Sequence, residues 1–188
     1  ALAAVPREAL DPTGQLELDT IRNQLELAKF AGEVEAVWAS DPLAYSYLIA
    51  AGLDDLINRD FAPVDERAAS LVARLEGLPA LVEQAIANLS DPARIRRPQA
   101  EVAVGQFAGV RTLIESEIPA KTADASESTK ARIAKASSEA LAAVDRLHHH
   151  IESALPKAEG AWRLGADAFA TKLALTLQTE LSADELVR

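Results

Sequence analysis

Apolar side chains recur every three or four residues through most of the sequence, and this spacing constrains the fold more than any other feature. On one segment, Ile133, Leu141, Val144, Leu147 and Ile151 all fall on a single helical stripe. Alanine and leucine, which favour helices, dominate the composition, and β-branched residues never gather into alternating runs. The sequence therefore predicts an all-α fold, a bundle of about seven to eight amphipathic helices, mostly antiparallel, with no sheet.

Aspartate followed by proline marks two helix starts. Asp11-Pro12 and Asp41-Pro42 each place a capping carboxylate before a proline. Proline fits the first helical turn because its missing N–H has no intrahelical partner there. We expect a first helix over residues 15–38, and a second that starts at Pro42 and stops at the NRDFAP turn.

Other prolines are expected to bound helices, because a proline inside a helix removes a hydrogen bond and clashes with the preceding turn. Pro79 is expected to start a fourth helix after a break at Gly77, rather than to interrupt a longer third helix. A fifth helix is expected to begin at Pro98 and to end at Pro119.

The rest of the chain predicts three more helix starts. The polar stretch TADASESTK is interpreted as a turn and a helix start, and the sixth helix should run to about Leu155. A seventh helix is expected over residues 162–178. Ser182 and Glu185 have the spacing of a capping box, which predicts the start of an eighth helix.

Length and composition bound the domain organisation. Hydrophobic residues make up 49% of the 188 residues, which is enough for one helical core. We expect residues 1–14 to be an N-terminal extension and residues 15–188 to form a single helical domain. The chain starts at Ala1, contains no methionine and stops as a capped helix begins, so we expect a fragment of a larger helical protein.

The excess of acidic residues limits the classes of partner that we expect, and other sequence features bear on the cellular location. A net charge of −10 disfavours nucleic acid and anionic membrane surfaces. No apolar run approaches the roughly 20 residues that span a bilayer. The chain has no cysteine and no export signal, so a cytoplasmic location is expected. Export stays open, because the native N-terminus is not seen.

The three histidines are consecutive, at residues 148–150, and raise the question of a metal site. Neighbouring residues on a helix point about 100° apart, so the triplet cannot converge on one ion. Asp145, His149 and Glu152, at i, i+4 and i+7, share a polar face and form a weak surface candidate for zinc. A solvated helix face explains the pattern more simply. No catalytic, cofactor-binding or metal residue is therefore assigned.

Aromatic and basic side chains leave a choice open between binding and packing. Trp38, Tyr45 and Tyr47 could line a groove, although packing between helices is the simpler interpretation. Arg67 and Arg74 could bind a carboxylate or phosphate, although pairing with the carboxylates just before Arg67 or with the acidic first helix is favoured. The sequence lacks a phosphate-cradling glycine loop, a Gly-x-Ser-x-Gly elbow and a His-Glu-x-x-His pair.

Three segments in order carry a resemblance to a known family: WASDPLAYSYLIAAGLDDLINRDFAP, DERAASLVARLEGLPALVEQAIANL and WRLGADAFATKLALTLQTELSADEL. From about Gln15 to Arg188, the chain resembles the large bacterial domain-of-unknown-function family eight-eight-five. The pattern is carried by Pro42, Tyr45, Pro63, Arg67, Arg74, Leu75, Pro79, Asn88, Leu89, Gly165 and Leu173.

The resemblance implies a function that this chain cannot perform alone. Full-length members look like zinc metallopeptidases similar to carboxypeptidase Taq-type enzymes, with a His-Glu-Gly-Tyr-Pro-Gly-His segment in the C-terminal half. In that chemistry the histidines bind zinc and the glutamate activates its water. This chain lacks the segment, so no catalytic residue carries over. The resemblance implies zinc for the full-length protein, no cofactor in this chain, the missing C-terminal half as partner, and a peptide substrate.

Two functions follow as expectations. The first is the helical N-terminal part of a zinc-dependent metallopeptidase-like hydrolase, which lines the substrate groove and is not catalytic by itself. The alternative is a non-catalytic helical protein-interaction module of unknown partner. A fragment should expose a large apolar patch, whereas a self-contained module should not exceed a few hundred Å2. Lipid-surface binding ranks last, because the first helix is acidic.

Overall fold

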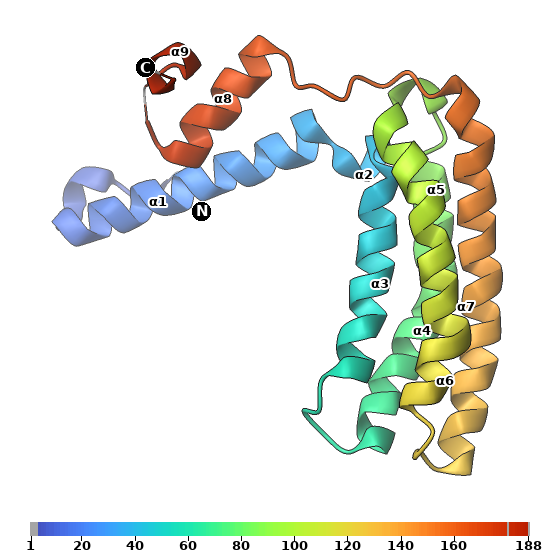
Figure 1. Ribbon diagram of the computed structural model, residues 1–188. Helices are drawn as coiled ribbons and strands as arrows, with labels where there is room; N and C mark the ends of the chain where they lie inside the picture. The colour runs from blue at the N-terminus through green and yellow to red at the C-terminus, as the bar shows by residue number, and fades with distance from the viewer. Residues whose placement is uncertain (1–3, 180, 188) are drawn as a thin grey trace. The chain divides into compact units, whose positions relative to one another are not determined.

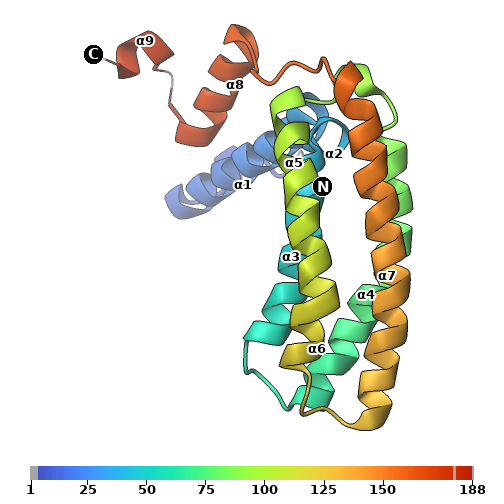
Figure 2. The same cartoon turned by 45° about the vertical axis from the view of Figure 1, so that its right-hand side comes forward.

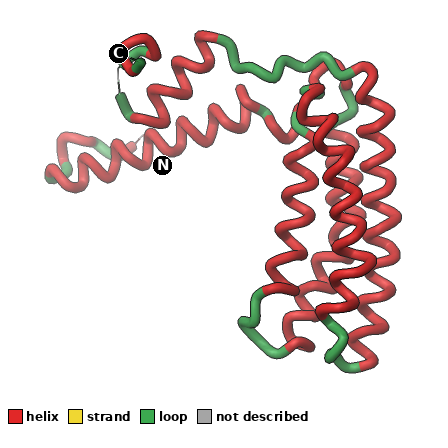
Figure 3. The backbone as a smooth tube through the Cα atoms, in the orientation of Figure 1, coloured by secondary structure: helices red, strands yellow, loops and turns green. Residues whose placement is uncertain are grey.

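The computed structural model describes residues 4–179 and 181–187. Within these residues the chain is helical apart from turns and loops, and its one β feature is an isolated bridge between Arg96 and Gly160 (Figure 3). The all-α fold predicted from the sequence is confirmed. The first three positions of the expected extension over residues 1–14, and positions 180 and 188, lie outside the described residues.

The chain divides into two compact units. The split unit combines two separated segments, Ala1–Val37 and Arg163–Arg188, and the bundle unit is the continuous segment Trp38–Trp162. Each unit is described by itself. The single domain expected over residues 15–188 stays a prediction.

In the split unit, one long helix packs against a shorter one from the end of the chain. The helical segments are a 3₁₀ turn at Arg7–Ala9, α1 (Pro12–Phe30), a π-helical turn at Ala31–Glu35, α8 (Ala166–Leu177) and α9 (Ala183–Leu186). Asp11 caps α1 as expected, because its carboxylate accepts a hydrogen bond from the Gly14 N–H at 2.7 Å. The capping box of Ser182 and Glu185 is also present, at the start of α9.

Two polar contacts join α8 to the first segment of the split unit, one to α1 and one to the π-helical turn at Ala31–Glu35. Asn23 Nδ2 donates a hydrogen bond to the carbonyl of Leu175 at 2.8 Å. Lys172 Nζ lies 2.5 Å from Glu35 Oε1. The first helix ends earlier than expected, because Ala36 has a left-handed φ of 40° after the π-helical turn. The last long helix starts later than expected, after Gly165, whose φ of 81° favours glycine.

The bundle unit is built around four long helices that lie side by side (Figures 1 and 2). Its segments are α2 (Val37–Ser40, which starts one residue before the unit), α3 (Pro42–Asn58), α4 (Val64–Asn88), a 3₁₀ turn at Pro92–Arg94, α5 (Arg97–Thr112), a π-helical turn at Leu113–Glu117, α6 (Ile118–Lys121), α7 (Glu127–Ala154) and a 3₁₀ turn at Leu155–Lys157. Asp41 caps α3 as expected. α7 begins after Ser126, within the stretch interpreted as a helix start.

The main interface of the bundle unit joins α4 to α7, and these helices run parallel. At their first turns, Ser126 N–H and Oγ donate to Asp65 Oδ1 at 3.1 and 2.9 Å. At their last turns, His150 Nε2 lies 3.1 Å from the carbonyl of Leu89. Both pairs are 61 residues apart in the chain. α4 and α7 are therefore held in one register at both ends.

The expected helix break at Pro79 is wrong, because α4 runs through it. Proline has no N–H to donate to the helix, and its ring clashes with the carbonyl of the residue four positions earlier. Burial outweighs that local cost, since apolar side chains continue on one stripe without a change of phase. The buried residues of this stripe are Leu71, Leu75, Leu78, Val82, Ala85 and Leu89. Their spacing of four and three residues is itself a sequence signal for one helix.

The expected helix end at Pro119 is also wrong. A π-helical turn at Leu113–Glu117 follows α5, and Pro119 lies inside the next helical segment, α6. The ring of a proline clashes with the carbonyl of the fourth residue before it, here Glu115. Because Glu115 lies in the wider π-helical turn, the chain stays helical through the proline.

Gly160 closes the end of the bundle unit after α7. Its N–H donates to the carbonyl of Ile95 at 2.8 Å. A Cβ at this position would lie 2.1 Å from the carbonyl oxygen of Arg94, so only glycine fits this backbone approach. Across the part of the chain that the structure describes, no helix combines the length and the apolar character needed to cross a bilayer.

Candidate functional site

The histidine triplet on α7 points in three directions. His150 lies against the carbonyl of Leu89, which can only accept, so His150 Nε2 carries the proton. His148 stacks on Phe107 of α5, with ring centroids 6.0 Å apart and an interplanar angle of 25°. His149 is exposed. His150 thus caps the end of α4, and His148 packs between helices.

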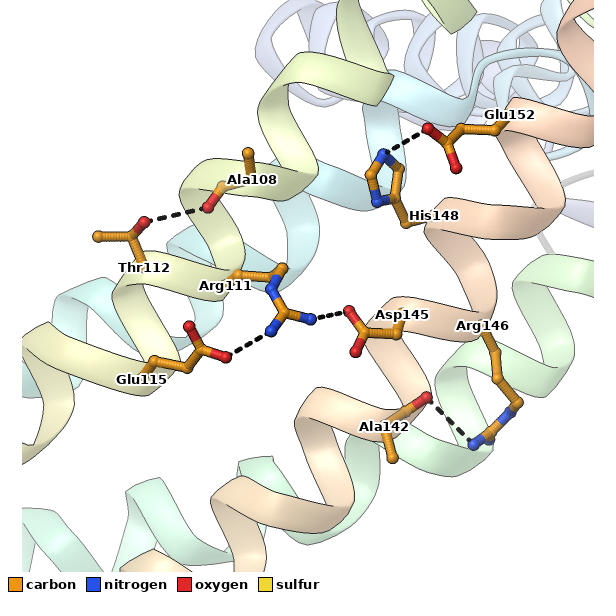
Figure 4. Close-up of polar contacts among 9 residues, drawn as sticks. All are labelled: Ala108, Arg111, Thr112, Glu115, Ala142, Asp145, Arg146, His148 and Glu152. Carbon is orange, nitrogen blue, oxygen red and sulfur yellow. Dashed lines mark hydrogen bonds and ion pairs between the residues drawn. The ribbon is translucent and has the colours of Figure 1, made fainter.

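A group of charged and polar side chains lies between α5 and α7, and we call it the α5–α7 polar cluster (Figure 4). It consists of Arg111, Glu115, Asp145, His148 and Glu152. The Arg111 guanidinium pairs with Asp145 across the two helices and with Glu115 one turn along, at 2.5 Å. The hydrogen bond to Asp145, with the charges of both carboxylates, raises the pKa of Arg111.

The second contact of the polar cluster lies one turn further along α7. His148 Nε2 is 3.7 Å from Glu152 Oε1, which is too long for a hydrogen bond. The His148 side chain is 24% exposed, and Glu152 is 50% exposed. Glu152 therefore faces His148 on the side of α7 that meets α5 (Figure 4).

The weak surface candidate for zinc, formed by Asp145, His149 and Glu152, is not a closed set in the structure. Asp145 is engaged by Arg111, Glu152 faces His148, and His149 is exposed. Among residues 4–179 and 181–187, no group of three or more His, Cys, Asp or Glu side chains is placed to hold a metal ion. These residues thus do not fit a zinc centre in this arrangement, and zinc uptake at this helix face stays a question for measurement.

The polar cluster holds α5 and α7 together through ion pairs. The Arg111 guanidinium binds both carboxylates of the cluster that lie near it, Asp145 and Glu115. The cluster joins α5 to α7 through partly exposed ion pairs, which contribute little free energy each but fix the helices' relative rotation.

The two arginines left open by the sequence have structural partners. Arg67 pairs with Asp60 at 3.1 Å and donates to the carbonyls of Leu56 and Ala62 at 3.2 and 3.0 Å. It therefore satisfies the end of α3. Arg74 donates to the carbonyl of Gly52 at 2.9 Å. The expected pairing of Arg67 with the carboxylates just before it is wrong, because the side chain turns back towards the loop after α3.

The aromatic residues also separate by role. Tyr45 is buried, donates from its hydroxyl to the carbonyl of Trp38 at 2.6 Å, and accepts from Asn88 Nδ2 at 2.9 Å. Trp38 and Tyr47 are exposed. Tyr45 thus packs the start of α3 against the end of α4, and no shared aromatic groove includes it.

Sequence reasoning missed Arg111, which pairs with Asp145 across the two helices. The two residues are 34 positions apart, on different helices, and no local pattern links them. Only the register between α5 and α7 could have paired them. Asp65, one of the two carboxylates just before Arg67, accepts instead from Ser126 at the start of α7.

Comparison with known proteins agrees with the resemblance seen in the sequence. The family model described as bacterial protein of unknown function (DUF885) matches residues 1–188. Searches of curated proteins and of solved structures gave no match. The chain therefore belongs to the bacterial family DUF885.

Proposed function

We propose that this chain is the helical, non-catalytic part of a zinc-dependent metallopeptidase-like hydrolase, and that it helps to line the substrate groove. Family membership supports the proposal through the resemblance of full-length members to carboxypeptidase Taq-type enzymes. The observation that carries it is the apolar surface of the split unit, which its own helices leave uncovered.

That apolar surface is spread over both helices of the split unit. On α1, Leu16, Ile21 and Leu25 are 68%, 47% and 54% exposed. On α8, Phe169 and Leu177 are 49% and 52% exposed. The buried apolar side chains among the described residues of this unit are Leu18, Phe30 and Ala36. α1 and α8 thus expose more large apolar side chains than they bury.

Such exposure calls for a covering surface. Each large apolar side chain gains about 1.5–3 kcal/mol when it moves from water to a packed interior, and monomeric proteins rarely leave several together in water. We infer that other parts of the full-length protein pack on α1 and α8. The zinc ligands of the proposed enzyme would then lie in those parts, since the described residues hold no ligand set.

The test compares this 188-residue chain with the complete gene product. Zinc is measured by elemental mass spectrometry on both, purified side by side without chelator. We expect about one equivalent in the complete product, as for a three-ligand catalytic site, and none in this chain. Peptide hydrolysis should follow the zinc and disappear on chelation. Zinc in neither protein would contradict the hydrolase proposal.

The alternative, a self-contained non-catalytic interaction module, should expose less apolar surface than a fragment does, and it also differs in the outcome of that experiment. It predicts no zinc and no hydrolysis in the complete product. A stoichiometric zinc ion in this chain alone would instead point to Asp145, His149 and Glu152. Substitution His149→Ala should then remove the metal, while His150→Ala, on the same helix, should leave it bound.

A further inference from the structure

A groove of about 480 Å3 lies between the segment that leads into α6 and the first half of α7. The surface of its wall is mostly apolar, and its lining includes Ile114, Pro119, Ile133 and Leu141. Its size and composition match those of pockets that hold small molecules. The groove belongs to the bundle unit alone and lies outside the contacts described for the α5–α7 polar cluster, apart from Glu115 at its edge.

Ser137 gives this groove an unsatisfied polar group. The residue is 8% exposed, and its Oγ has no hydrogen-bond partner. A serine inside a helix usually bonds back to the carbonyl four residues earlier or points to water. Ser137 does neither, although it lines the groove. A buried hydroxyl of this kind is costly to leave unpaired. Rotation to another staggered position about its Cα–Cβ bond re-aims the hydroxyl, so the free group indicates a hydrogen-bonding ligand in the groove that Ser137 lines.

The charged groups and the threonine in the wall are already paired, and Ser138 is exposed to solvent. Glu115 lies 2.5 Å from Arg111, and Lys130 Nζ lies 3.0 Å from Glu127 Oε1. Thr122 Oγ1 donates to the carbonyl of Ile118 at 2.7 Å. A charged ligand would have to compete with these pairs. The groove therefore offers an apolar wall, one buried hydroxyl without a partner, and no unpaired charge among its lining residues.

We propose that this groove binds a neutral, mostly apolar small molecule through a single hydrogen bond to Ser137 Oγ. The class includes long-chain alcohols and simple esters or amides, whose oxygen can pair with the hydroxyl. Lys130 and Leu141, at the two ends of the wall on α7, are eleven residues apart, which is about 16 Å of helix. The molecule that fits is therefore elongated.

The experiment titrates the 188-residue chain with 1-octanol and, separately, with octanoate, and follows the backbone amides by two-dimensional NMR. We expect saturable shifts by 1-octanol at residues 130–141, and binding of octanoate at least tenfold weaker. Ser137→Ala should weaken 1-octanol binding about fivefold while the fold is kept, because one neutral hydrogen bond is lost.

Two matched substitutions separate groove filling from changes to the helix. Ala134 lines the groove and is exposed, so Ala134→Phe can place a large side chain in the groove without disturbing the core. It should abolish 1-octanol binding. Ala142→Phe, also exposed and outside the groove wall, should leave it unchanged.

Three results would overturn the proposal. The first is an absence of saturable shifts in this chain. The second is equal binding of octanoate and 1-octanol, which would show that charge is not discriminated. The third is unchanged 1-octanol affinity in Ser137→Ala. None of these results depends on zinc or peptide hydrolysis, so the groove and the hydrolase proposal can fail separately.

Discussion

Both units are built from amphipathic helices, but they bury different shares of the apolar stripes on those helices. In the bundle unit, the apolar stripes of α3, α4, α5 and α7 meet one another, and residues such as Leu75 and Leu147 are fully buried. In the split unit, α1 and α8 carry stripes of similar spacing and bury only part of them. An amphipathic pattern thus predicts a helix with an apolar face, but it does not say whether that face is covered by the same chain.

The largest expected effect is a difference in stability between two variants, each of which truncates one leucine, one in each unit. Leu75→Ala should destabilise the bundle unit by about 3 kcal/mol, because the side chain is 0% exposed and leaves a cavity in the core. Leu25→Ala, at 54% exposure on α1, should cost less than about 0.5 kcal/mol. Urea denaturation followed by circular dichroism measures both. Equal costs would mean that α1 is packed in solution, and the comparison would fail.

A backbone contact gives the next largest effect, and it is again confined to the bundle unit. Gly160→Ala should destabilise that unit by about 2–3 kcal/mol, because its Cβ would meet the Arg94 carbonyl at 2.1 Å. Gly32→Ala, in the split unit, has open space around the new methyl group and serves as the control. Thermal denaturation of both variants checks this. A neutral Gly160→Ala would refute the close approach.

Pro79 tests how far tertiary burial holds α4 together. Pro79→Ala restores a backbone N–H inside the helix and should stabilise the bundle unit by about 1–2 kcal/mol, since part of the gain is offset by a more flexible unfolded chain. A rise in the urea midpoint is the measurement. Loss of stability would show that the proline marks a real helix boundary in solution, as the sequence alone suggested.

The smallest effect is a dependence on pH at the first turns of α4 and α7. Hydrogen bonds from Thr129 and Ser126 lower the pKa of Asp65. Its carboxylate therefore contributes stability at every pH above its unfolded-state pKa of about 3.9, and loses it as the pH falls through the lowered folded-state value. Asp65→Asn should lower the urea midpoint slightly at pH 7, and the difference should shrink towards pH 3.

Asp19 offers the counterpart in the split unit, because a hydrogen bond from Arg7 lowers its pKa in the same direction. Asp19→Asn should follow the same pH trend if the 3₁₀ turn at Arg7–Ala9 stays packed against α1 in solution. A midpoint difference that stays constant between pH 7 and pH 3 in either variant would contradict the assigned contacts.

The sequence predicted the helices and most of their caps, because these depend on spacing and on residues close in the chain. Asp11, Asp41 and the Ser182–Glu185 box all behave as expected. It failed at Pro79 and Pro119, where a local signal for a helix end is outweighed by burial or absorbed by a π-helical turn. At Pro79 the deciding interaction is with neighbouring helices, whereas at Pro119 it is the local π-helical turn that precedes the proline.

The candidate site was harder to predict for the same reason. The divergence of the three histidines follows from helical geometry and needs no tertiary knowledge. The engagement of Asp145 by Arg111 and the orphaned hydroxyl of Ser137 depend on how α5 and α6 meet α7. A single sequence does not specify that register.

The parallel pairing of α4 with α7 has a consequence for how the protein is made. Partner residues on these helices are 61 positions apart, so a ribosome that adds about 5–20 residues per second finishes α4 about 3–12 seconds before its partner exists. During that interval the stripe from Leu71 to Leu89 has only α3 to cover it. Nascent α4 therefore carries a long apolar stripe that lacks its main packing partner until α7 is synthesised.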